Sequence, residues 1–172
     1  ALKPGGIVSQ WIPLHSQTET NIYQHFQTFL NSFPYAMAWY PVDKELILIG
    51  SNQPINIDFQ NIEQRLENPV IQKIMSDIDF GTPYSFLGSI WYLKNELKRL
   101  SSDESIISDN HPSLEFFLDV DIKGSGVSEA GINRIIESRS AFDDVFEKIT
   151  QSSYFLSKAQ KGNFKKHWDN RL

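Results

Sequence analysis

Three adjacent polar residues, Asp109, Asn110 and His111, are the densest group of side chains able to do chemistry in this chain of 172 residues. A carboxylate, an amide and an imidazole together could bind a polar ligand or move a proton. Asp-Asn-x-Pro is also an ordinary turn sequence, and we favour the turn. The four histidines lack ligand spacing and there is no cysteine, so the sequence predicts no metal site, no disulfide and no cysteine nucleophile.

Two glycine-containing segments are interpreted as structural and not as phosphate-binding loops. Residues 4–6 (Pro-Gly-Gly) predict a tight turn and residues 124–126 (Gly-Ser-Gly) a linker, because neither has the context of a phosphate-cradling loop. The acidic pairs at 103–104 and 143–144 are expected on solvated faces. We therefore assign no catalytic, cofactor-binding or metal-binding residue from these patterns.

The chain opens with a predicted strand followed by a predicted helix. Residues 6–14 form a short apolar run rich in β-forming residues, which Pro13 ends. Ser16 and Glu19 then match the S-x-x-E capping box. Apolar residues at helical spacing predict an amphipathic helix over 18–32.

A hairpin is predicted next, and it completes the expected α/β unit. Residues 35–42 and 45–50 are β-rich runs joined by a connection short enough for antiparallel pairing. One parallel strand, a helix and a terminal β-hairpin are the C-terminal portion expected of a Rossmann-like, class I methyltransferase-like sheet. The fold class is therefore predicted to be α/β.

The remainder of the chain predicts a largely helical C-terminal extension and no further strand. An extended segment packed on the body is expected over 101–121. The expected division is a first domain over 1–121, a linker over 122–127 and a helical extension over 128–172. Helices are predicted over 58–67, 70–79, 83–100 and 128–149, followed by a basic terminal helix.

Composition limits the classes of protein and partner. A hydrophobic fraction of 40% is ample for a packed core, and a net charge of -5 argues against attraction to nucleic acid or to an anionic membrane surface. No apolar run approaches the length that crosses a bilayer, which takes about 18 residues or more. A cytoplasmic location is expected, with a parent chain that could be anchored to a membrane.

Three motifs in a fixed order carry a resemblance to a known family. They are LKPGGIVSQWIPL at 2–14, AWYPVDKELILIGS at 38–51 and SDNHPSLEF at 108–116, separated by predicted helices. Together they resemble the spermidine synthase family, and especially the spermidine synthase-like domains found behind membrane helices. The first motif alone occurs across many methyltransferases, so the order of the three carries more information than any one of them.

The resemblance implies transfer of an aminopropyl group from decarboxylated S-adenosylmethionine, as co-substrate, to an amine of a diamine, without a metal. It implies that Gln10 faces the diamine or the reacting centre and that Tyr40 lines the same slot. It also implies that Trp11 and Trp39 supply apolar or cation-π walls around the cationic substrate. The substrate-binding residues expected in this chain are therefore Gln10, Tyr40 and Trp11.

Each of these residues also has a purely structural interpretation. Gln10 could be a polar residue satisfied by backbone groups at the end of a strand. Tyr40 could be a half-buried packing residue of the hairpin. Trp11, Trp39 and Trp91 could belong to the core, as tryptophans more often do.

The resemblance places the glycine-rich nucleotide loop, the acidic ribose-binding residue and the amine-activating aspartate upstream of residue 1. We therefore expect the chain to be a fragment of a longer parent and to be inactive alone. A methyltransferase of the same fold is the second hypothesis. A non-enzymatic interaction module, with residues 128–172 binding a partner, is the third.

An open sheet edge is the last expectation. The strand at 6–14 is expected to pair with the hairpin on one side and with an upstream strand on the other. If that second neighbour is missing, the apolar edge favours pairing with another chain. Self-association through this edge is therefore predicted, giving a homo-oligomer.

Overall fold

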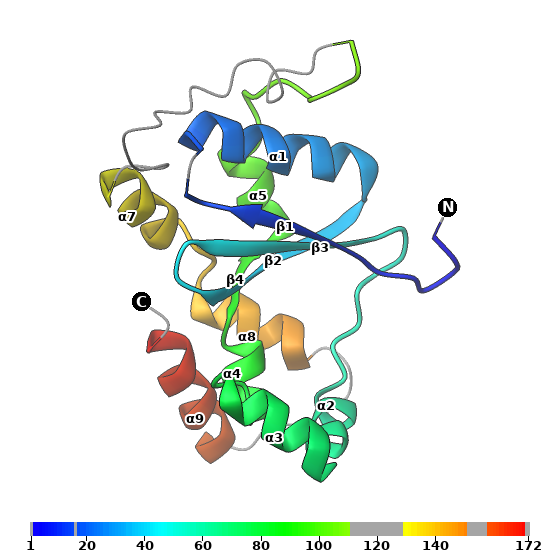
Figure 1. Cartoon of the computed structure of the whole chain (residues 1–172), viewed down its shortest axis with the longest axis vertical. Coiled ribbons are helices and arrows are strands. Elements are labelled where there is room, and N and C mark those ends of the chain that lie inside the picture. Colours follow the sequence, from blue (N-terminus) through cyan, green and yellow to red (C-terminus); the bar gives the residue numbers. More distant parts are fainter. Residues whose placement is uncertain (1, 16, 111–128, 151–157, 171–172) are drawn as a thin grey trace. The chain divides into compact units, whose positions relative to one another are not determined.

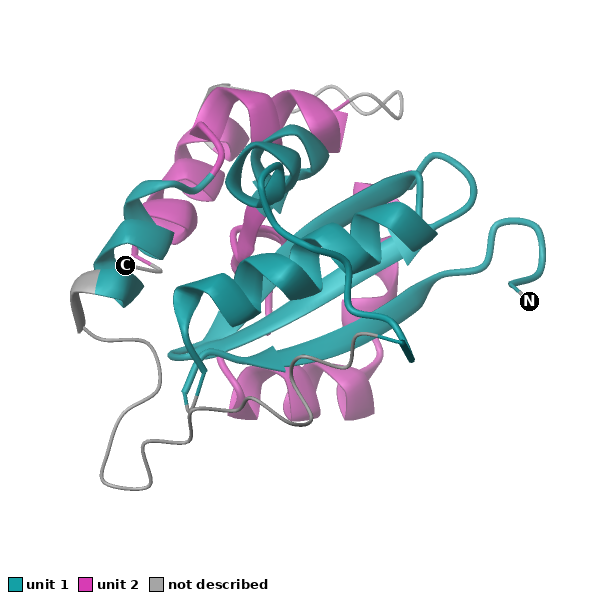
Figure 2. Cartoon of the chain, turned by 90° about the horizontal axis from the view of Figure 1, so that it is seen from above, with its two compact units in different colours: residues 1–55, 92–139 teal, residues 56–91, 140–172 magenta. Residues whose placement is uncertain are grey.

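The computed structural model describes residues 2–15, 17–110, 129–150 and 158–170. The chain forms two compact units that alternate along the sequence. Unit 1 comprises Ala1–Ile55 and Tyr92–Arg139, and unit 2 comprises Asn56–Trp91 and Ser140–Leu172 (Figure 2). The linker expected over 122–127 lies outside the described residues.

Unit 1 is a mixed α/β structure built on a sheet with the strand order β1-β3-β2-β4 (Figure 1). β3 runs antiparallel to both β1 and β2, so β1 and β2 run parallel to each other on either side of it. β4 begins in unit 2 and ends in unit 1. The elements of this sheet and its helices are β1 (Val8–Pro13), α1 (Glu19–Ser32), β2 (Tyr35–Val42), β3 (Glu45–Ser51), β4 (Ile90–Leu93), α5 (Lys94–Ser101) and α7 (Glu129–Glu137).

The strand, helix and hairpin predicted from the first fifty residues are confirmed. The register pairs Gln10 with Leu48 and Leu48 with Ala38, which gives one row of side chains across three strands. α1 covers the face that carries this row, because Phe29 of α1 packs directly over Gly50 of β3. The core under α1 holds Ile12, Ile22, Phe26, Ala36, Leu46, Leu48, Tyr92 and Leu97.

The start of α1 differs from the prediction. Ser16 lies outside the described residues, and the N-cap is Thr18, whose hydroxyl accepts a hydrogen bond from the Asn21 backbone N–H at 3.2 Å. Glu19 instead accepts hydrogen bonds from Arg134 of α7 and ties the two helices together. These hydrogen bonds lower the pKa of Glu19 below its usual value.

The single helix expected over 83–100 is wrong. The structure has a short helix α4 (Pro83–Leu87), then β4, then α5. α4 begins at Pro83, the predicted start, and Thr82 is its N-cap. The prediction failed after Gly88 because Ile90, Trp91 and Tyr92 are all buried, and a fully buried run of β-forming residues is stabilised as a strand despite its helical spacing.

The single helix expected over 128–149 is also wrong. α7 ends at Glu137 in unit 1, and α8 (Phe142–Thr150) begins in unit 2. Between them, buried Ser140 donates its backbone N–H to the Trp91 carbonyl at 2.8 Å. In a continuous helix the Ser140 N–H would bond to a carbonyl of the preceding turn. Here it bonds to the distant Trp91 carbonyl instead, which separates the two helices.

Unit 2 is helical, and its core holds residues from both of its segments. Phe142 of α8 packs its ring against Phe164 and Trp168 of α9 at centroid distances of 5.4 and 5.6 Å. The terminal basic helix predicted from the sequence is thus present and its aromatic residues are buried. The helices are α2 (Phe59–Leu66), α3 (Pro69–Asp77), α4, α8 and α9 (Lys158–Asp169).

The segment after α5 follows the surface of α1 where it is described. Gln24 donates to the Ser105 hydroxyl at 3.1 Å, and the Ile107 backbone N–H donates to the Thr28 hydroxyl at 2.9 Å. Residues 111–121 of the expected extended segment lie outside the described residues. Among the described helices, none is long and apolar enough to cross a membrane.

Candidate functional site

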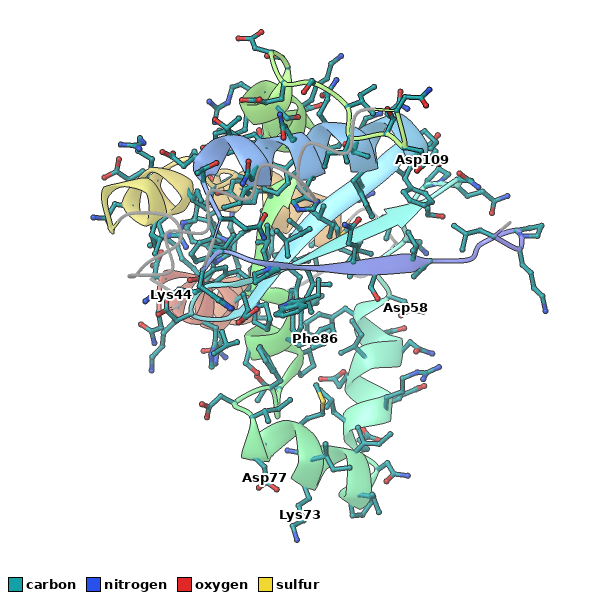
Figure 3. The ribbon with its side chains drawn as sticks, turned by 45° about the horizontal axis from the view of Figure 1, so that its top comes forward. Lys44, Asp58, Lys73, Asp77, Phe86 and Asp109 are labelled. Atoms are coloured by element: carbon teal, nitrogen blue, oxygen red, sulfur yellow. The ribbon has the colours of Figure 1, made fainter. Side chains whose placement is uncertain are left out.

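The carboxyl ends of the two parallel strands β1 and β2 meet at one end of the sheet. The hairpin turn after β2 brings them together, since Pro13 of β1 pairs with Glu45 at the start of β3. The Leu14 backbone N–H donates to the Lys44 carbonyl at 2.8 Å, and Figure 3 labels Lys44 at the tip of this turn.

Tyr40 is the buried member of this site. Its hydroxyl donates to Asp43 Oδ1 at 3.0 Å and accepts from the Lys44 backbone N–H at 2.8 Å. Burial raises the pKa of Tyr40 to about 12, so the phenol is neutral at ordinary pH. Tyr40 thus holds the turn, in which Lys44 has a φ of 62°.

Trp11 is the exposed aromatic residue of the site. Its side chain is 60% exposed, and its indole Nε1 donates to Glu45 Oε2. His15 Nδ1 lies 3.6 Å from the other oxygen of the same carboxylate. The two carboxylate oxygens of Glu45 therefore contact the Trp11 indole and the His15 imidazole, one each.

The structure brings two of the three expected substrate residues to the same face of the sheet and places the third on the other. Gln10 and Tyr40 share the face covered by α1, where Gln10 lies in mid-strand opposite Leu48 and is exposed. Trp11 lies on the opposite face, in a row with Ile47 and Trp39. Adjacent strand residues point to opposite faces, so Gln10 and Trp11 do not line one slot.

Asp43 and Glu45 are the candidate functional residues that the sequence analysis did not single out. The sequence predicts only a short connection between the two strands of the hairpin, and it does not mark the Asp43 carboxylate in that connection as a ligand group. The signal in the sequence that could have identified them is two acidic residues at the tip of a predicted hairpin. Their position beside Tyr40 and Trp11 became visible only once the register was known.

The arrangement suits recognition of a cationic group. Two carboxylates provide acceptors, and the exposed Trp11 ring offers a face for cation-π contact. A neutral tyrosine already bound to Asp43 is not available as a base. In the described part of the chain, no group of three or more histidine, aspartate or glutamate residues could hold a metal ion.

A separate hollow of about 230 Å³ lies between α1 and α5. Lys94 and Lys98 line it together with Gln27, Leu30 and Asn31. Its charge is opposite to that of the hairpin site, so it does not extend the same ligand-binding surface.

The candidate site is identified from the structure of this chain alone. Comparison with protein families, with curated proteins and with solved structures gave no match to this chain.

Proposed function

We propose that this chain is the diamine-binding, C-terminal part of a spermidine synthase-like aminopropyltransferase with a class I methyltransferase-like fold. One observation carries the proposal: two carboxylates, Asp43 bound by Tyr40 and Glu45 bound by Trp11, lie in and beside the hairpin turn at the carboxyl ends of β1 and β2. The β1-α1-β2-β3 order supports it, because a strand, a helix and an antiparallel hairpin follow one another as expected for the end of such a sheet.

The chemistry of the site fits a diamine better than it fits a phosphate ligand. An ammonium group is held by carboxylate oxygens and by the face of an indole ring. A phosphate ligand would call for backbone N–H donors or basic side chains, whereas the hairpin tip offers carboxylates. This chain's part in the reaction is therefore to bind and orient the amine.

Catalysis needs groups that the resemblance assigns outside this chain. They are the glycine-rich loop for decarboxylated S-adenosylmethionine and the aspartate that takes the proton from the attacking amine. We expect no aminopropyl transfer by these 172 residues alone.

Association through the edge of β1 belongs to the same proposal. β1 is an outer strand of the described sheet. Leu14 bonds to β3 through its N–H, and ladder bonds alternate along a strand, so the N–H groups of Ser9 and Trp11 point away from β3. That edge takes a further strand of a parent domain or the β1 strand of a second copy.

Calorimetric titration with putrescine tests the proposed function. We expect a weak complex, with a dissociation constant on the order of 1 mM because the contacts are solvent-exposed. Glu45→Gln should weaken it at least about threefold, since the amide keeps the shape and loses the charge. Methylthioadenosine should give no heat of binding.

Two controls make the titration specific. Glu63→Gln removes the same charge from an exposed position of α2 in the other unit, and putrescine binding should not change. Butylamine, with one ammonium group, should bind more weakly than putrescine. Equal losses for Glu45→Gln and Glu63→Gln, or no putrescine binding by the folded chain, would refute the diamine site.

A further inference from the structure

Helix α3 presents an apolar stripe that nothing in the described structure covers. None of its residues is buried. The exposed fractions are 68% for Val70, 58% for Ile74 and 38% for Ile71, and 55% for Ile78, the C-cap residue that follows the helix. Branched apolar side chains gathered on one helix face in this way mark an interaction surface more often than scattered exposed residues do.

The stripe is not what holds α3 in place. The Asn68 side chain caps its start, accepting from the Val70 backbone N–H at 3.0 Å, and Pro69 occupies the first helical turn. On the polar side, Gln72 donates to the Gly81 carbonyl at 3.1 Å. A nine-residue helix gains little stability by itself, and among the described residues none covers the apolar face of α3.

The spacing of the stripe is symmetric about Ile74. Val70 and Ile78 stand four residues before and four residues after it. If a second α3 runs antiparallel across a two-fold axis at Ile74, Val70 of each copy faces Ile78 of the other. Such a two-fold contact uses the same patch on both copies, and this pattern is complementary to itself.

The charges beside the stripe are of opposite sign, and their midpoint, Met75, lies one residue from the axis at Ile74. Lys73 and Asp77 lie one turn apart on one flank, and neither forms an ion pair with another described residue. Figure 3 shows both side chains pointing outward from α3. In the antiparallel arrangement Lys73 of one copy approaches Asp77 of the other, which offsets the unfavourable position of an aspartate in the last helical turn.

We propose that α3 is a two-fold interface between copies of this chain, with Ile74 at its centre. A lipid surface fits less well, because helices that lie on membranes carry an excess of lysine and arginine and α3 has one lysine and one aspartate. One helix from each copy buries less than the about 1,200 Å² of stable interfaces. The dimer is therefore weak, with a dissociation constant on the order of 10–100 µM.

Sedimentation velocity over a concentration series tests the proposal. The wild-type mass should rise from monomer to dimer across this range, and Ile74→Glu should raise the dissociation constant more than about tenfold, because two carboxylates then meet at the axis. Gln64→Glu places the same group on an exposed position of α2 and should leave the dimer intact. Far-UV circular dichroism checks that both variants keep their helices.

A charge exchange distinguishes this interface from nonspecific contact. Lys73→Glu and Asp77→Lys should each raise the dissociation constant about three- to tenfold, since each turns an attraction into a repulsion. The double variant should recover most of the wild-type affinity. Only a self-complementary pairing of the two positions gives that recovery.

Pairing of copies through the edge of β1 is the other interface that would produce a dimer. Ser9→Pro removes a donor that points away from β3 and should leave the α3 dimer unchanged, as the matched Ser9→Ala should. Dissociation by Ser9→Pro with no effect of Ile74→Glu would overturn the α3 interface in favour of the β1 edge. A wild-type monomer at several hundred micromolar would overturn it outright.

Discussion

Tyr40 shows how one side chain can fix the shape of a functional surface without being part of the chemistry. Its hydroxyl bonds to Asp43 and to the Lys44 backbone, so it orients the turn that carries the acidic group. Removing the hydroxyl leaves a backbone donor without its partner in the structure. We therefore regard Tyr40 as a positioning residue for the hairpin tip.

Tyr40→Phe should lower the free energy of unfolding by about 1–2 kcal/mol at pH 7, because the Lys44 N–H loses its acceptor. The pH dependence gives a second signature. The folded-state pKa of about 12 exceeds the ordinary value of 10.0, so the tyrosine contributes stability that is fully present below pH 10 and falls as the pH rises toward 12. Urea unfolding of the wild type at pH 7 and pH 11 should show this loss, and Tyr40→Phe should show less of it.

Tyr35→Phe is the matched control. Tyr35 lies on the same strand and is 40% exposed. Removal of the Tyr35 hydroxyl should leave the free energy of unfolding at pH 7 unchanged. Equal behaviour of the two variants would contradict the role given to Tyr40.

At the scale of elements, the packing of α1 on the sheet depends on a close approach at Gly50. A Cβ atom there would stand 2.6 Å from a ring carbon of Phe29 and 2.9 Å from the ring of Phe33. Both rings sit at the end of α1 and contact each other with centroids 4.9 Å apart. The helix therefore has little room to move away from β3.

Gly50→Ala should lower the free energy of unfolding by about 1–3 kcal/mol through overpacking. Gly162→Ala is the control, because no atom lies within 4 Å of a Cβ at that position of α9. Alanine favours a helix over glycine there and should raise the stability by about 0.5–1 kcal/mol. Thermal unfolding followed by circular dichroism gives both values, and a neutral Gly50→Ala would show that α1 is not held against the sheet.

At the scale of the whole molecule, each unit is built from two segments that are separated in the sequence by a segment of the other unit. Residues 140–172 complete unit 2, which begins at Asn56. Buried Phe164 and Trp168 show that the terminal helix belongs to the core of that unit. These two aromatic side chains are therefore part of the packed core of unit 2.

Deleting residues 158–172 should unfold unit 2 and spare the sheet of unit 1. Phe142 would lose both aromatic neighbours on α9. Each large buried side chain lost costs about 3–5 kcal/mol, and the total stability of a domain is only about 5–15 kcal/mol. Hydrogen exchange should show lost protection in α4 and α8 and kept protection in β1, β2 and β3. Uniform loss in both units would show that they fold as one.

The sequence by itself determined the elements whose signals are local. Apolar runs rich in β-forming residues, helical spacing and a short connection in the first fifty positions predicted β1, α1 and the hairpin, and the helix predicted to start at residue 83 begins there as α4. Alternation alone also implies that Gln10 and Trp11 face opposite ways in a strand. The expectation of one slot lined by both did not use that information.

Tertiary structure determined the conformation of segments in which contacts with distant residues outweigh the local secondary-structure preference. Burial converted residues 90–93 from helix to strand, and the Trp91 carbonyl bound the Ser140 N–H between α7 and α8. The meeting of Trp11 and Glu45 likewise depends on the register of strands more than thirty residues apart. Spacing along the chain reports which side chains share a face, whereas the free energy of burial and of hydrogen bonding depends on which faces finally meet.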